Sequence, residues 1–224
     1  ATNQQTWTST ELSVFDFLMT GSIGNIDIAS GLQFRDESFD VARGASSIAK
    51  FDAAGNITQP ADLLFLGGGL ESTASRNATA LFIEGSMNPS DRLEVKGALR
   101  YEDLESDSSV DPKIAFRYQA SDELALRASF STSFREASLA QLTSTNISLQ
   151  GIQDYNADGS AKGGTAFIRI AQANNPNLAP EESENMNIGA MWNPTDKLSM
   201  KLDYWAIDYT NVITIESAQG KVAA

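Results

Sequence analysis

Apolar and polar residues alternate with a period of two along most of this chain. In segment 92–102, the odd positions carry Leu, Val, Gly, Leu and Tyr, whereas the even positions carry Arg, Glu, Lys, Ala, Arg and Glu. Segments 113–119, 123–135 and 197–204 alternate in the same way. Because successive side chains of a β-strand point to opposite faces, the pattern predicts strands with one apolar and one polar face.

The alternating segments predict about eight strands, and most of them are longer than the roughly 5–6 residues usual in globular sheets. Their lengths match the ~9–11 residues that a tilted β-strand needs to cross a bilayer. The expected strands cover residues 9–19, 23–35, 75–86, 91–104, 111–120, 122–135, 184–193 and 197–210.

The connections between these strands alternate in length. Three of them share one plan of small or polar residues followed by Ser or Thr, Asp, a polar residue and Leu: MNPSDRLEV, YQASDELAL and WNPTDKLSM. These three are expected to be hairpin turns, because Asn, Pro, Ser and Asp favour tight turns. The tight connections are expected at 20–22, 87–90, 121 and 194–196, and the longer ones at 36–74, 105–110 and 136–183.

Short turns on one side and long loops on the other are typical of outer-membrane barrels, whose turns are periplasmic and whose loops are extracellular. The sequence therefore predicts an all-β fold: a segment of an antiparallel, up-and-down transmembrane β-barrel. Two alternatives remain open. One is a small eight-stranded structural or adhesive outer-membrane barrel, and the other is a secreted soluble β-domain that binds calcium or carbohydrate.

Composition narrows the function. The chain carries 29 Asp and Glu against 16 Lys and Arg, a formal charge of −13. No basic stripe is present to displace the counterions of phosphates, so nucleic acid is not an expected partner. The sequence has neither Cys nor His, which excludes thiol catalysis, Ser–His–Asp triads and Cys/His zinc sites. We therefore expect no enzymatic activity.

The chain contains three ordered motifs, FREASL at 134–139, NPNLAPE at 175–181 and DYW at 203–205. Together they resemble the middle-to-late barrel of TonB-dependent outer-membrane receptors. That family typically shows Phe-Arg-Ala-Pro-Ser-Leu after a strand, then Asn-Pro-Asx-Leu-Lys-Pro-Glu, then a hairpin ending in Asp-Tyr-Trp. This chain departs from the pattern at Glu136, Ala137 and Ala179. The matching residues are Phe134, Arg135, Ser138, Leu139, Asn175, Pro176, Asn177, Leu178, Pro180, Glu181, Asp203, Tyr204 and Trp205.

The resemblance implies that residues 1–224 form part of one barrel domain, about eight or nine of some 22 strands. It implies a receptor in the bacterial outer membrane that imports a scarce ligand, such as a siderophore, cobalamin or an oligosaccharide, using energy transmitted by TonB. The expected partners are membrane lipid, a plug domain, the TonB complex and a small-molecule ligand. The plug, the TonB box and the terminal strands are expected to lie outside these residues.

Two sets of side chains are candidates for specific roles. The loops at 36–74 and 136–183 are expected to form part of the ligand vestibule. The cations Lys113, Arg117, Arg127 and Arg135 lie on the polar faces of their expected strands, and we expect them to face the lumen or the plug.

The stretch DYNADGS offers a weak calcium loop, with oxygens from Asp154, Asn156 and Asp158. The position that would carry the bidentate Glu is Thr165, so a solvated Asx/Gly turn is the competing interpretation. No other cofactor is expected.

Overall fold

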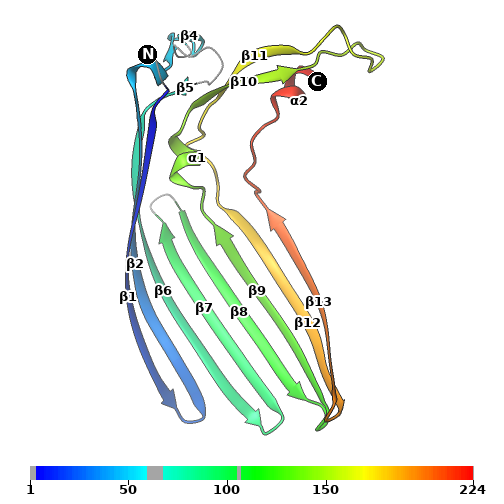
Figure 1. Cartoon of the computed structure of the whole chain (residues 1–224). Helices are drawn as coiled ribbons and strands as arrows, with labels where there is room; N and C mark the ends of the chain where they lie inside the picture. Colours follow the sequence, from blue (N-terminus) through cyan, green and yellow to red (C-terminus); the bar gives the residue numbers. More distant parts are fainter. Residues whose placement is uncertain (1–3, 60–67, 105–106, 224) are drawn as a thin grey trace.

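A computed structural model describes residues 4–59, 68–104 and 107–223, and its main element is one curved, eight-stranded antiparallel sheet (Figure 1). The strand order is β1-β2-β6-β7-β8-β9-β12-β13, so each strand pairs with its neighbour in the chain apart from the short elements of the loops. These strands are β1 (Thr6–Ile23), β2 (Ile26–Arg43), β6 (Ser72–Ser90), β7 (Leu93–Leu104), β8 (Asp107–Gln119), β9 (Leu124–Arg135), β12 (Glu181–Thr195) and β13 (Leu198–Thr210).

All eight predicted strands are present, which confirms the all-β, up-and-down fold. In the described residues β1 and β13 are the two edges of the sheet and do not pair with each other, so the closed eight-stranded barrel alternative is wrong. Both the N and the C labels in Figure 1 lie at the end of the sheet that carries the long loops. No helix in the described part of the chain has the length and hydropathy to cross a membrane.

The apolar face of the sheet is exposed rather than packed. Leu81, Leu99, Ile114 and Ile188 expose 43–53% of their surface, and Leu202 exposes 76%. A soluble β-domain would bury this face in a core, so the soluble alternative is also disfavoured. A contiguous exposed apolar surface of this kind matches the lipid-facing band of a membrane barrel.

Three of the predicted turns are hairpins at the same end of the sheet (Figure 1). Two of them contain Asn-Pro, and in both the register shifts beside the proline, between Met87 and Ser90 and between Trp192 and Thr195. Proline has no N–H to donate to the ladder, so the pairing is interrupted there and a bulge forms. The Asn-Pro form of the sequence plan thus encodes a bulged turn twice, whereas the register between β8 and β9 has no such shift.

Several predicted boundaries were wrong, because residues with turn-like composition continue to pair. The first turn is Gly24–Asn25 rather than 20–22: Ile23 pairs with Ile26, and Gly24 supplies the positive φ of 64°. The connection at 105–110 shrinks to 105–106, which lie outside the described residues, because Leu104 pairs with Asp107.

The predicted loops at 36–74 and 136–183 were also longer than the loops in the structure. Residues 36–41 and 72–74 continue the ladder between β2 and β6, and residues 42–43 still pair with β1. The first loop therefore covers 44–71, and the second covers 136–180. At ~3.3 Å per residue the 18-residue strands β1 and β2 are roughly 60 Å long. They therefore project well beyond the ~25 Å apolar band of a membrane barrel.

The loops contain short elements that alternation did not predict. The first loop holds a 3-10 turn, η1 (Ala45–Ser47), and the small strands β3 (Lys50–Phe51), β4 (Ile57–Gln59) and β5 (Gly68–Gly69). The second holds α1 (Leu139–Thr143), β10 (Asn146–Ile152) and β11 (Ala166–Gln172), and α2 (Ala218–Ala223) follows β13. Strands β11, β10 and β5 form a second sheet of three strands.

Candidate functional site

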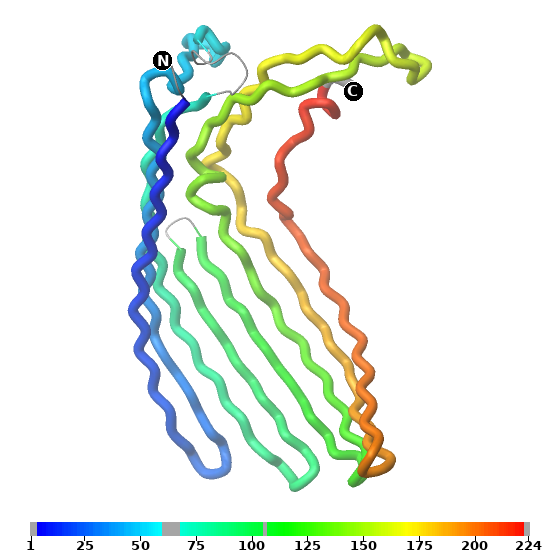
Figure 2. The backbone as a smooth tube through the Cα atoms, viewed as in Figure 1, coloured from blue at the N-terminus to red at the C-terminus, as the bar shows by residue number. Residues whose placement is uncertain are grey.

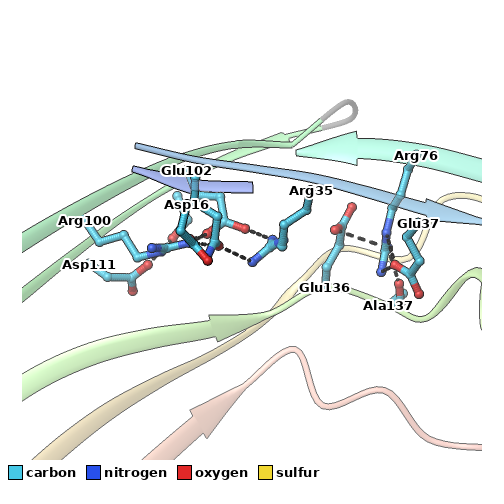
Figure 3. Close-up of polar contacts among 11 residues, drawn as sticks. Asp16, Arg35, Glu37, Arg76, Arg100, Glu102, Asp111, Glu136 and Ala137 are labelled. Atoms are coloured by element: carbon cyan, nitrogen blue, oxygen red, sulfur yellow. Dashed lines mark hydrogen bonds and ion pairs between the residues drawn. The ribbon is translucent and has the colours of Figure 1, made fainter. Parts of the chain in front are cut away.

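The polar face of the curved sheet carries a network of ion pairs centred on Glu102 (Figure 3). Glu102 is only 2% exposed, and its two carboxylate oxygens pair with Arg35 on β2 and with Arg100 on its own strand, the latter at 2.7 Å. Arg35 reaches Glu102 across β6, where the intervening residues are Ala78 and Ala80. These small side chains leave room for the long guanidinium arms, which cover them almost completely in return.

A second group of ion pairs joins the eight-stranded sheet, which we call the wall, to the segment that follows β9. Arg76 lies 2.7 Å from Glu37 and 3.2 Å from Glu136. Its guanidinium also donates to the carbonyl oxygen of Ala137 at 2.6 Å. Arg76 therefore fixes the start of the second loop against β2 and β6 (Figure 3).

The four cations expected to face the lumen lie on this same face, but most of them are engaged by the wall. Arg127 donates to Asp203 with an Nε–Oδ1 distance of 3.0 Å, and Arg135 pairs with Glu181. Arg117 donates to the side chain of Gln119 at 3.1 Å.

Lys113 differs from those three cations. It borders a groove lined mainly by small residues, together with Asp27, Ile28, Glu84 and Lys96. In the described part of the chain no ion-pair partner approaches Lys113 within 4 Å. Of the four cations, Lys113 therefore retains the most freedom to meet a partner in the lumen, which stays a prediction.

Residues of the family-like motifs meet at the loop end of the sheet. Arg135 Nε donates to Glu181 Oε2 at 2.5 Å, and the backbone N–H of Ile213 donates to Glu181 Oε1 at 2.7 Å. Glu181 is the first residue of β12 and lies beyond the exposed apolar band. These two hydrogen bonds, first the one from Arg135, lower the pKa of Glu181 to about 2. The ion pair between Arg135 and Glu181 thus connects the first motif to the second.

The Ser-Leu part of the first motif anchors the second loop. Ser138 caps α1 in a capping box with Gln141, so the helix starts with its first N–H groups satisfied. Leu139 is 4% exposed and packs into a small core with Phe39 and Val41. The loop therefore leaves the sheet at a fixed point.

The remaining motif residues lie in the second loop or along the strands β9 and β13. Asn175 receives a hydrogen bond from the N–H of Asn177, and its own N–H donates to the carbonyl of Gln141. Asp203, Tyr204 and Trp205 lie on β13, where Asp203 and Trp205 share the polar face and Tyr204 lies on the apolar one. The other motif residues lie on β9 or in the segment that leads into β12: Phe134, Pro176, Leu178 and Pro180.

The two loops and the segment after β13 form one assembly, which we call the canopy: the described residues of 44–71, 136–180 and 211–223. β5 of the first loop pairs with β10 of the second, through Gly68 with Ile147 and Gly69 with Asn146. The side-chain amide of Gln219 exchanges two hydrogen bonds with the backbone of Gln153, at 2.7 and 2.8 Å. Figure 2 shows the arm of β10 and β11 extending toward the C-terminal segment.

Arg43, at the end of β2, joins the canopy to the wall. Its guanidinium donates to the carbonyl of Leu70 at 3.1 Å, to the hydroxyl of Thr6 at 3.2 Å and to the amide oxygen of Asn146 at 2.6 Å. Gly69 lies against it so closely that a Cβ there would overlap both the guanidinium and a backbone carbonyl. One arginine thus links two strands of the wall and both loops.

A cavity of about 1230 Å³ lies between the canopy and the ends of β1 and β2. Its lining comes from both ends of the second loop, from α1 and β11, and from the segment after β13. The second of the expected vestibule loops therefore lines this cavity. From the range predicted for the first loop, the lining includes Phe39, Val41 and Arg43, and all three of these residues lie on β2.

The calcium candidates form a self-contained turn between β10 and β11. Asp158 accepts hydrogen bonds from the N–H and hydroxyl of Ser160, which lower its pKa, and Asp154 pairs with Lys162 at 3.3 Å. Among the residues described, no group of three or more His, Cys, Asp or Glu is arranged to hold a metal. Calcium binding at Asp154, Asn156 and Asp158 stays a prediction, and the hydrogen bonds match the Asx-turn interpretation.

Sequence reasoning missed Arg35, Arg43, Arg76, Arg100 and Glu102. Alternation placed Arg100 and Glu102 on the polar face, but their partners come from a strand two positions away in the sheet. Only the register reveals that contact. Arg43 was assigned to a loop, so its position at the end of a paired strand was hidden.

A model of the TonB dependent receptor-like β-barrel family matches residues 1–223. The chain belongs to this family, which confirms the resemblance of the motifs. No curated protein sequence matches the chain.

Solved structures with the same fold include two receptors and one transporter. The siderophore receptor PirA from Acinetobacter baumannii has a TM-score of 0.64 at 16% identity, over 91% of this chain and 27% of that one. A variant of the ferric enterobactin receptor PfeA from Pseudomonas aeruginosa, in complex with enterobactin, has a TM-score of 0.63 at 16% identity over the same shares. The copper transporter OprC has a TM-score of 0.56 at 13% identity, over 89% and 30%. The chain thus spans less than a third of the length of each of these proteins.

Proposed function

From membership in the TonB-dependent receptor β-barrel family, we propose that this chain is a wall segment and extracellular canopy of an outer-membrane transporter. The transporter captures a scarce small ligand outside the cell and imports it with energy that TonB transmits. One observation carries the proposal: the strands are long enough to cross a bilayer, and the sheet has an exposed apolar face on one side and a polar face with ion pairs on the other.

The two faces have different tasks in this proposal. The apolar face contacts outer-membrane lipid. The polar face lines the lumen, where Lys113 and the small-residue groove beside it face the plug domain. The ion pairs of Glu102 and Arg76 stiffen the wall, so that movement of the plug does not deform the barrel.

The canopy has the task of capturing ligand. Arg43 and the pairing of β5 with β10 hold both loops in one assembly above the lumen. A preorganised vestibule loses less conformational entropy on binding than two independent loops would. Transport, rather than catalysis, is the activity that such an arrangement supports.

Fractionation and uptake test the proposal. We expect the native protein in the outer-membrane fraction, released only by detergent. We expect cells to accumulate radiolabelled ferrichrome, ferric enterobactin or maltohexaose in a manner that requires both this protein and TonB. Release without detergent, or uptake of all three probes that is unchanged when TonB is deleted, would contradict the proposal.

A further inference from the structure

The polar lining of the canopy cavity is predominantly neutral. It combines side-chain amides with the hydroxyls of Thr6, Thr8 and Ser144, between apolar residues from the wall and loops. Such a lining offers both donors and acceptors of hydrogen bonds, and no large formal charge. The amides are Gln141, Asn146, Gln150, Gln172 and Asn175.

Several of these amides keep unused hydrogen-bonding atoms. Asn146 accepts from Arg43 with its oxygen, which leaves its NH₂ group. Gln150 donates to Ser148, which leaves its oxygen. In the described part of the chain the side chain of Gln172 has no hydrogen-bond partner at all, and it is exposed. The cavity can therefore bind a ligand that both donates and accepts.

The charged residues at the cavity are already committed to one another or to the fold. Lys221 lies 2.7 Å from Glu216, so the two charges offset each other. The guanidinium of Arg43 is held by three oxygens of the wall and loops. The carboxylate of Glu71 accepts from the backbone N–H of Arg43 at 2.9 Å and lies close enough to offset the charge of this arginine.

The canopy as a whole is acidic. In the described part of segment 44–71, one Lys stands against one Asp and one Glu, a net charge of −1. Segment 136–180 has one Lys and one Arg against two Asp and one Glu, a net charge of −1, and segment 211–223 has one Lys and one Glu. A trianionic ferric tris-catecholate would therefore be repelled on approach, whereas a neutral ligand would not.

We propose that this cavity selects electrically neutral ligands rich in hydroxyl or amide groups and discriminates against anionic chelates. A neutral oligosaccharide and a neutral ferric trihydroxamate share this chemistry. The inference rests on the proposed transport function and names the ligand class of its vestibule. This ligand class differs from the ligand of the structurally similar PfeA variant, which was solved in complex with enterobactin.

Calorimetric titration of the native protein in detergent tests the selectivity with three probes. Ferrichrome is neutral, ferric enterobactin is trianionic and of similar size, and maltohexaose is neutral and metal-free. We expect at least one neutral probe to bind about tenfold more tightly than ferric enterobactin or better, and the tighter neutral probe identifies the source of the shared chemistry. Equal or tighter binding of ferric enterobactin, or failure of both neutral probes, overturns the proposal.

Charge variants locate the selectivity in the cavity. Gln172→Lys adds one cation to the lining and is expected to tighten binding of ferric enterobactin several-fold while weakening the neutral probe. Ala157→Lys adds the same charge at the exposed turn between β10 and β11, outside the lining, and serves as the control. Equal effects of the two variants would overturn the assignment to this cavity.

This test and the test of transport fail independently. If uptake depends on TonB but ferric enterobactin is the preferred probe, the transport function stands and the neutral-ligand assignment falls. If no probe is taken up in a TonB-dependent manner although a neutral probe binds, the transport function falls instead.

Discussion

Replacing Glu102 by Gln is the sharpest test of the proposed role of the polar wall. The substitution keeps the shape of the side chain but removes the charge that two guanidiniums share. Glu102 is 2% exposed, so water cannot replace it as a partner within the wall. Breaking a fully buried ion pair in this way costs about 3–5 kcal/mol.

The two arginines reduce that cost, because Arg35 and Arg100 expose 33% and 31% of their side chains. Water solvates part of each guanidinium once the carboxylate is gone. We therefore expect Glu102→Gln to lower the free energy of unfolding by about 2 kcal/mol, a factor of roughly 30 in the unfolding equilibrium.

The assay is equilibrium unfolding of the native protein by urea in lipid vesicles, followed by tryptophan fluorescence. Glu94→Gln is the matched control, because Glu94 lies on the same strand and face and pairs with Lys96 at 2.8 Å. Glu94 is 34% exposed and Lys96 59%. The control is expected to change the free energy of unfolding by no more than about 0.5 kcal/mol. If the two variants are equally stable, the network of Glu102 does not stiffen the wall.

Three further predictions follow from the loop end of the sheet, the wall and the canopy. The pKa of Glu181 is lowered from 4.5 to about 2. The stability that its ion pair with Arg135 adds at the loop end of the sheet is therefore fully present above pH 4.5 and is lost as the pH falls through 2. Hydrogen exchange of the segment after β13 should accelerate over that range, and Glu181→Gln should remove the pH dependence; an unchanged dependence in the variant would refute the assignment. Gly189→Ala should lower the free energy of unfolding by up to about 1 kcal/mol, because its Cβ would displace the Arg127–Asp203 ion pair above it, whereas Gly97→Ala enters open space and should not destabilise; equal urea midpoints would contradict this. Gly69→Ala should separate the two loops, because its Cβ overlaps a backbone carbonyl and the Arg43 guanidinium. Spin labels on cysteines introduced into β3 and β10 of this Cys-free chain should then show a broader distance distribution, and an unchanged distribution would show that the loops are not coupled through Gly69.

The contact between Arg135 and Glu181 shows how much of the structure the motifs alone could predict. The motifs around Arg135 and Glu181 were recognisable because the family writes them in a fixed order, and their order predicted the family correctly. That these two residues form one ion pair, with Ile213 as a third partner, depends on the return of a 45-residue excursion to the neighbouring strand. No local pattern encodes where such a loop returns.

Alternation with a period of two determined the strands, their two faces and the up-and-down order, because a strand exposes its pattern locally, residue by residue. Turn-forming residues determined three of the four hairpin turns, where Asn, Pro, Ser and Asp favour the turn through backbone geometry. Only the tertiary structure decided the ends of the strands, since residues 36–43 and 107–110 read as loop yet pair with a partner strand. It alone decided the partners of Glu102 and Arg43 and the joining of the two loops, because those contacts depend on register across several strands and on chain segments far apart in sequence.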